Sequence, residues 1–205
     1  MAKNIKKIAI IGGGASGLTA AIKAAEQGFN VTILEKADRT GKKILKTGNG
    51  RCNLSNINVS KSFYNHPDFV TDVLEKIPCE KLLSFYKSIG LLTTKDAEGR
   101  IYPYSDSATS VLDVLRLRCM SLGVKEQVNT EVKDIKKQKD NTFLLDTNAA
   151  PFTADKVIVS VGGGSNLLKE LGHNVINFEP ILCPLKTDIS KIKALSGLRS
   201  KCKVT

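Results

Sequence analysis

Residues 5–35 read IKKIAIIGGGASGLTAAIKAAEQGFNVTILE, and this stretch decides the fold. The apolar run at 5–11 predicts a strand that is covered on both faces, and it stops at three glycines. Small, helix-forming residues follow at 15–27, and Gly28 is the residue type that ends a helix. A second, β-branched run follows at 31–34. The stretch therefore predicts a right-handed strand–helix–strand unit of a parallel sheet.

The turn between the first strand and the helix carries the pattern G-x-G-x-x-G. Gly12 permits the tight turn, Gly14 lets backbone approach a pyrophosphate, and Gly17 lets the helix pack closely on the sheet. Ala15 and Ser16 begin the helix, whose free N–H groups and positive dipole end favour a diphosphate. The pattern and its context predict a dinucleotide site here.

Glu35 ends the second strand, about 20 residues beyond the glycines, as dinucleotide-binding proteins require. Its carboxylate would accept hydrogen bonds from the ribose of the adenosine half and would repel a 2′-phosphate, which disfavours NADP. Lys36 follows and adds positive charge to the expected cofactor site. These residues fit FAD and NAD equally.

The rest of the chain predicts an α/β, Rossmann-like domain with helices on both faces of a parallel sheet. Residues 36–58 show neither helical nor strand periodicity, which suggests a functional loop. An antiparallel meander is inserted before the fourth parallel strand. The predicted elements are helices at 67–76, 79–88 and 107–122, a hairpin at 91–104, parallel strands at 124–128 and 156–161, and meander strands at 131–137, 142–147 and 152–153.

Composition narrows the class of protein. The 205 residues are 41% hydrophobic and carry a formal charge of +11, concentrated in segments 36–51 and 186–203. Phosphate groups of a cofactor account for the first segment, and the 5% aromatic content without tryptophan argues against a nucleic-acid partner. Five cysteines without a C-x-x-C pair indicate reduced thiols and no metal site. No apolar run reaches the length of a membrane span, so we expect a cytoplasmic protein.

Residues 8–56 are similar to the N-terminus of the HI0933-like, or aminoacetone oxidase, family of bacterial FAD-binding flavoproteins. The specific part is GKKIL at 41–45 followed by TGNGRCN at 47–53, which generic dinucleotide binders lack. Further agreement extends over GRIYP at 99–103 and, near the end, Gly172-His173 and Pro184-Leu185. The resemblance implies a FAD domain of the glutathione-reductase type.

The resemblance also implies where the cofactor is held. Val132 would offer its backbone edge to adenine, and Gly162 and Gly163 would let the cofactor approach the end of the fourth parallel strand. The loop after the second strand would approach the pyrophosphate and the flavin. Its candidate contacts are Lys42, Lys43, Thr47, Gly48, Asn49, Gly50, Arg51 and Asn53. Cys52 lacks a partner cysteine nearby and is expected to be a structural thiol.

Family members are about twice as long, with a second, mostly β domain and a return segment that completes the flavin site. The resemblance thus implies a FAD-binding domain at 1–185 and the start of a second domain at 186–205, and weak FAD binding by these residues alone. The expected function is FAD-dependent oxidation or reduction of a small molecule, with NAD(P)H as a further partner. Amine oxidation, enone reduction and a non-catalytic role stay open, and no catalytic residue is identified. The rivals are an NAD-binding dehydrogenase domain and a basic RNA-associated protein.

Overall fold

The computed structural model describes residues 6–163, 167–176, 188, 190–191 and 193–195. Within these residues, the central sheet is parallel and has the strand order β10-β1-β2-β6. Ile10 in the middle of β1 pairs with Ile33 on one side and with Ile158 on the other. The strands of this sheet are β1 Lys7–Ile11, β2 Asn30–Leu34, β6 Lys125–Gln127 and β10 Lys156–Val159. The predicted parallel sheet is therefore confirmed.

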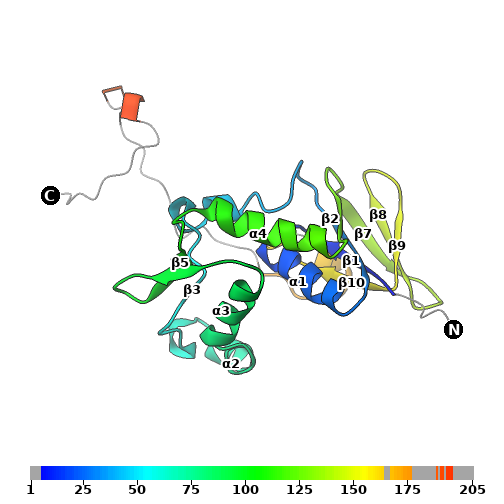
Figure 1. Cartoon of the computed structure of the whole chain (residues 1–205). Helices are drawn as coiled ribbons and strands as arrows, with labels where there is room; N and C mark the ends of the chain where they lie inside the picture. The colour runs from blue at the N-terminus through cyan, green and yellow to red at the C-terminus, as the bar shows by residue number, and fades with distance from the viewer. Residues whose placement is uncertain (1–5, 164–166, 177–187, 189, 192, 196–205) are drawn as a thin grey trace. The chain divides into compact units, whose positions relative to one another are not determined.

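One face of the sheet is covered by two helices, α1 (Ala15–Glu26) and α4 (Ala108–Ser121), which lie side by side (Figure 1). Alternate strand residues such as Ile8 and Ile10 point to this face and are buried against the helices. Ser107 caps α4 by accepting a hydrogen bond from the backbone N–H of Thr109 at 3.3 Å, as the sequence predicts.

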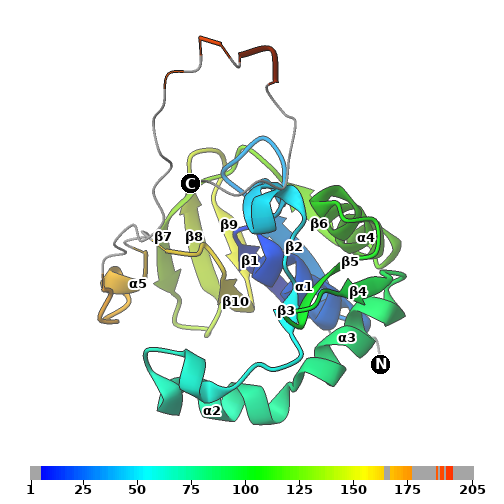
Figure 2. The same cartoon turned by 90° about the vertical axis from the view of Figure 1, so that its left-hand side faces the viewer.

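The opposite face is covered by a second sheet in the order β7-β8-β9, so that the meander and α4 flank β1 (Figure 2). Ala9 and Ile11 alternate with the helix-facing residues and pack here with Leu145, which is fully buried. Helices were expected on both faces. On this side, however, the meander provides the cover, to which the one-turn helix α5 (Leu167–Glu170) adds Leu167. The strands are β7 Val132–Lys137, β8 Phe143–Thr147 and β9 Phe152–Ala154.

A third group of elements lies between β2 and α4 in the chain. The predicted hairpin forms β4 and β5, and β3 joins the outer side of β5, which the sequence analysis did not foresee. Helices α2 and α3 form at their predicted positions. The elements are β3 Ser55–Asn56, β4 Thr93–Lys95, β5 Arg100–Pro103, α2 Pro67–Lys76, α3 Cys79–Ser88, and the 3₁₀ segments η1 Ile44–Gly50 and η2 Lys61–Phe63.

The chain divides into a unit of residues 1–175 and a unit of residues 176–205. In the second unit, the described part includes a single 3₁₀ turn, η3 Lys193–Leu195. The predicted domain boundary between residues 185 and 186 lies outside the described residues. None of the described helices combines the length and apolar character that crossing a lipid bilayer demands.

Candidate functional site: a cavity at the carboxyl ends of the parallel strands

A cavity of about 820 Å³ lies in the first unit, where β1, β2 and β10 end. Parallel α/β sheets bind their ligands at this edge. The segments after the three strands all line the cavity. From the predicted set, the lining includes Gly12, Gly14, Ala15, Ser16, Glu35, Lys36, Lys42, Lys43, Thr47, Asn53, Val132, Gly162 and Gly163.

The three glycines of the motif have different structural roles. Gly12 adopts φ +96°, and a Cβ there would lie 2.7 Å from the carbonyl oxygen of Ser160. A Cβ on Gly17 would lie 1.9 Å from the carbonyl oxygen of Gly12, so this glycine lets α1 approach the turn and does not line the cavity. At Gly14 a Cβ would meet no atom within 4 Å. Only Gly14 thus leaves space that a ligand could use.

The N-terminus of α1 opens onto the cavity. Gly14 is the N-cap residue and supplies no side-chain cap, and the first turn of α1 contains no acidic residue. The first N–H groups of a helix have no partner within the helix and carry its positive dipole end. Ser160, just after β10, packs against the same turn, and its single hydroxyl proton is shared between the carbonyl oxygens of Ile11 and Gly12 at 2.9 and 2.8 Å. The arrangement suits a diphosphate.

Glu35 lies at the cavity and is bound to the backbone on both sides. Its Oε2 accepts a hydrogen bond from the N–H of Gly13 at 2.7 Å, and its Oε1 accepts one from Ala37 at 2.8 Å. Gly41 donates its N–H to the carbonyl oxygen of Gly13 at 2.7 Å, which closes the following loop onto the glycine turn. The carboxylate therefore orders the turn, and each oxygen retains a lone pair for a ribose hydroxyl.

The segment that begins β7 passes beside Glu35. The N–H of Thr130 donates to the carbonyl oxygen of Glu35 at 2.8 Å, and Thr130, Glu131 and Val132 all line the cavity. Val132 is buried, with 6% of its surface exposed. Because its side chain is buried, Val132 can contact a ligand mainly through its backbone.

The loop at 36–58, called the basic loop below, contributes positive charge to the cavity wall. Lys42 pairs with Asp38 at 2.6 Å, and the Lys42 ammonium group holds the pKa of the Asp38 carboxyl below its usual value. The Lys43 Nζ lies 3.6 Å from the point where a Cβ on Gly162 would sit. Lys43 thus reaches from this loop to the segment after β10, and both segments belong to the predicted site.

The loop at 44–53 is only partly in the cavity. Thr47 and Asn53 line it, whereas Gly48, Asn49, Gly50 and Arg51 do not. The geometry therefore does not favour a direct contact between these four residues and a cofactor. Arg51 instead pairs with Asp106, and its guanidinium stacks on Tyr102.

Most of the other lining residues adjoin predicted ones in the sequence, whereas Tyr86 is brought to the cavity only by tertiary structure. Tyr86 comes from α3, about 50 residues after Glu35, and nothing in its local sequence signals a site. Burial, with a smaller contribution from Cys52, raises the pKa of the Tyr86 phenol, so this group is neutral at physiological pH. Cys52 itself is buried and lines the cavity. The cavity residues outside the predicted set are Ile11, Gly13, Leu34, Ala37, Arg39, Gly41, Ile44, Cys52, Leu54, Tyr86, Thr130, Glu131, Ser160 and Val161.

Solved structures share this fold at low sequence identity. A Thermovibrio ammonificans THI4 structure matches with a TM-score of 0.55 and 14% identity over 81% of this chain and 61% of that one. Glycine oxidase from Geobacillus kaustophilus matches with a TM-score of 0.52 and 18% identity over 82% of this chain and 59% of that one.

Two enzymes are similar in sequence along nearly the whole chain. A 3-dehydro-bile acid delta(4,6)-reductase of Clostridium scindens is 37% identical over 98% of this chain and 52% of its own length. A ribosomal RNA dihydrouridine synthase of Haemophilus influenzae is 27% identical over 96% of this chain and 53% of its own length. The chain thus spans about half the length of these relatives.

The model of the HI0933-like protein Rossmann domain matches residues 6–177, which includes the glycine turn, the basic loop and every segment that lines the cavity. With the fold and the glycine turn as described, the chain belongs to the HI0933-like family.

Proposed function

We propose that the cavity binds FAD and that this chain is the cofactor-binding part of a flavin-dependent oxidoreductase. One observation supports the proposal most strongly: the ribose-type acid Glu35, the open N-terminus of α1 and the loop containing Asn53 all line the same cavity. An extended dinucleotide needs an acid at its ribose and a helix N-terminus at its diphosphate, and the loop with Asn53 offers a contact for the remaining part of the ligand.

The proposal assigns a part of the ligand to each segment. Glu35 would accept hydrogen bonds from the ribose, and the backbone at Val132 would face the adenine. The N-terminus of α1, with Lys43 opposite, would neutralise the diphosphate. Asn53, which has both a donor and an acceptor, would contact the edge of the flavin ring. When bound, the flavin would supply the transfer of a hydride or of electrons.

The reaction that we propose is reduction of a carbon–carbon double bond conjugated to a carbonyl group. The names of the relatives point to this common chemistry, because a delta(4,6) 3-dehydro-bile acid and a uracil ring both contain such a bond. Addition of a hydride and a proton across it gives the saturated product. The neutral phenol of Tyr86 lines the end of the cavity nearest Cys52, where it could donate a hydrogen bond to the substrate oxygen.

Two substrate classes fit this reaction. We favour a small, apolar enone, because the relative with 37% identity acts on a bile acid. A uracil base within RNA is the second candidate, supported by ribosomal RNA dihydrouridine synthases of Haemophilus influenzae and Escherichia coli at 27% and 25% identity and by the charge of +11. An RNA substrate would give binding that weakens steeply with salt.

The cofactor is tested by titrating the protein with FAD and with NAD and by identifying any extracted cofactor by mass. We expect binding of FAD and none of NAD, and the reverse result would overturn the assignment. The substrate is tested in the whole oxidoreductase that contains this chain, loaded with FAD, under anaerobic conditions with NADH or NADPH, by comparing a 3-oxo-Δ4 steroid with a uridine-containing ribosomal RNA fragment. Reduction of the RNA alone would replace the first substrate class with the second.

A further inference from the structure

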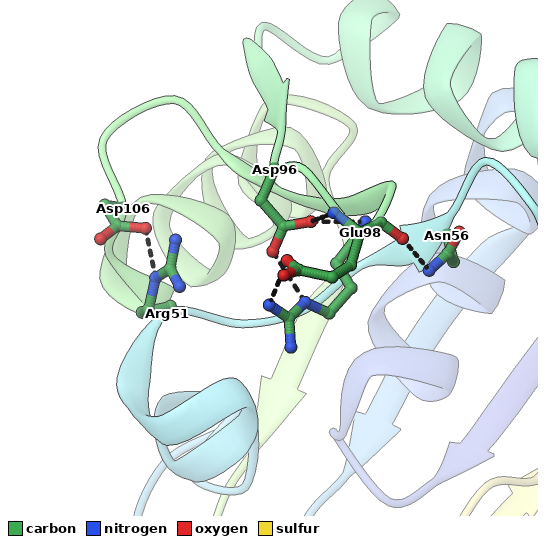
Figure 3. A network of polar contacts seen from close by, with 6 residues as sticks. Arg51, Asn56, Asp96, Glu98 and Asp106 are labelled. Carbon is green, nitrogen blue, oxygen red and sulfur yellow. Dashed lines mark hydrogen bonds and ion pairs between the residues drawn. The ribbon is translucent and has the colours of Figure 1, made fainter. Parts of the chain in front are cut away.

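Arg51 does not line the cavity, although the two residues that follow it, Cys52 and Asn53, do. Its Nε donates a hydrogen bond to Asp106 Oδ1 at 2.5 Å (Figure 3), and its guanidinium carbon lies 3.9 Å from the centre of the Tyr102 ring. Asp106 lies directly before α4, and Tyr102 is a buried residue of β5. Arg51 thus connects the loop to two elements that are about 50 residues distant in the chain.

The loop around Arg51 has an uncommon backbone. Gly48, Asn49, Gly50 and Cys52 all have φ between +52° and +79°. Backbone hydrogen bonds from Arg51 to Gly48 and from Cys52 to Thr47 hold the turn. A cysteine in the left-handed region is sterically disfavoured, and it persists only where the surroundings fix the conformation. Cys52 is held in this state by its backbone hydrogen bond to Thr47 and by burial in the core, and contacts that fix the neighbouring Arg51 add to this restraint.

We infer that Arg51 is a positioning residue, which fastens this loop to Asp106 and Tyr102 and so keeps Cys52 and Asn53 against the cavity. The ligand that this wall would meet follows from the proposed function and is the flavin ring of FAD. The positioning itself is a property of the protein alone and can be measured without any cofactor.

The competing explanation is that Arg51–Asp106 is an ordinary surface ion pair. The two side chains are 33% and 58% exposed, and exposed pairs contribute little to global stability. The chain offers a matched control in Arg100 at the start of β5, which pairs at 2.7 Å with Asp96 and Glu98 from the turn before it. Asp96 and Glu98 are labelled in Figure 3. None of these three residues lines the cavity. If loss of any surface ion pair loosened the protein, substitution of Arg51 and of Arg100 would change Cys52 labelling and FAD affinity equally. A positioning role predicts a change only on substitution of Arg51.

The first experiment uses Cys52 as a reporter in the cofactor-free protein. Iodoacetamide is added, and alkylation of the peptide containing Cys52 is followed by mass spectrometry. Because Cys52 is 8% exposed, we expect slow labelling in the wild type and about tenfold faster labelling in Arg51→Gln and Asp106→Asn. Arg100→Gln should be labelled at the rate of the wild type and should have the same thermal unfolding midpoint. Equal labelling of all four proteins would overturn the inference.

The second experiment measures FAD affinity and the visible circular dichroism of bound FAD in the same variants. We expect Arg51→Gln and Asp106→Asn each to weaken binding about tenfold and to change the spectrum, and the double variant to be no weaker than either single one. Arg51→Lys should recover part of the affinity, since it retains the charge but not the flat stacking group. Additive losses, or an equal loss in Arg100→Gln, would contradict a shared positioning role.

The two experiments separate the inference from the proposed function. If the wild type binds no FAD, the cofactor assignment fails, and the labelling rates still decide the role of Arg51. If FAD binds and labelling does not respond to Arg51→Gln, the cofactor assignment stands and the positioning role is wrong.

Discussion

The two ends of the cavity are built in different ways. At the glycine end, the wall is a continuous turn between β1 and α1 that is held by backbone contacts and by Glu35. At the other end, the loop of Cys52 and Asn53 depends on side chains from β5, α3 and the start of α4. Local sequence thus determines the structure of the first wall, whereas packing between distant segments determines that of the second.

The largest effect should come from a methyl group added at the glycine end. Gly17→Ala places a Cβ 1.9 Å from the carbonyl oxygen of Gly12, so the backbone must shift. We expect a loss of about 3 kcal/mol in the free energy of unfolding, as in overpacked cores. Gly14→Ala adds the same methyl group where nothing lies within 4 Å and should cost at most about 1 kcal/mol, because alanine is a poorer N-cap than glycine. Urea unfolding of both variants checks this, and equal stabilities would show that the turn is not rigid.

Gly14→Val should remove FAD binding and leave the fold intact. The side chain would fill the space that the pyrophosphate needs, while the N-cap has no side-chain hydrogen bond to lose. Calorimetric titration with FAD measures the affinity, and circular dichroism monitors the fold. Undiminished affinity would mean that the diphosphate does not lie over the N-terminus of α1.

Glu35→Gln should weaken both the protein and its ligand binding. An amide has one acceptor oxygen, so the N–H of Gly13 or Ala37 would face an NH₂ group, which costs about 1 to 2 kcal/mol of stability. FAD affinity should fall about tenfold, by loss of a charge-assisted hydrogen bond to ribose. The control is Glu131→Gln, which also changes a cavity glutamate. A loss of affinity without a loss of stability would show that the two backbone bonds are dispensable.

The smallest expected effect on stability depends on pH, and it distinguishes Cys119 from Cys52. Cys119 is fully buried in α4, its thiol donates to the carbonyl oxygen of Leu18 in α1, and burial raises its pKa to about 12. A raised folded-state pKa gives stability that is present below the unfolded value of about 8.5 and is lost as pH rises towards 12.

Between pH 8 and 9.5 we therefore expect the wild type to lose about 1 kcal/mol more stability than Cys119→Ala. Urea unfolding at the two pH values measures the difference. At pH 8 in the native state, iodoacetamide should reach Cys52 at the cavity before it reaches Cys119. Parallel pH profiles of the two proteins would show that Cys119 does not titrate in the unfolding equilibrium.

The same contrast explains how much could be predicted from the sequence. The parallel strands, α1, α4 and the meander follow from periodicity and from glycine positions, since each is a local signal. The cover of the second face by the meander, and not by a helix, depends on long-range packing. The pairing of β3 with β5 was missed because Ser55 and Asn56 have no strand signal of their own.

The site shows the same division. The lining role of Gly14, Glu35 and Lys43 follows from motif spacing and resemblance. Arg51 was predicted to contact the cofactor; in the structure it pairs with Asp106, lies over Tyr102 and does not line the cavity, and the pattern of the sequence gives no sign of these partners. Tyr86 joins the cavity only through the placement of α3, which no local pattern encodes.

The double anchoring of Glu35 has an evolutionary consequence. In dinucleotide-binding proteins, acceptance of a 2′-phosphate requires replacement of this acid, because its charge repels the phosphate. Here the same carboxylate also fixes the N–H groups of Gly13 and Ala37. A lineage that exchanged it would disorganise the turn before it gained a new preference, so at least two substitutions would have to arise together. Under the proposed function, selectivity against a 2′-phosphate would therefore be protected against drift by a structural role that has nothing to do with ribose.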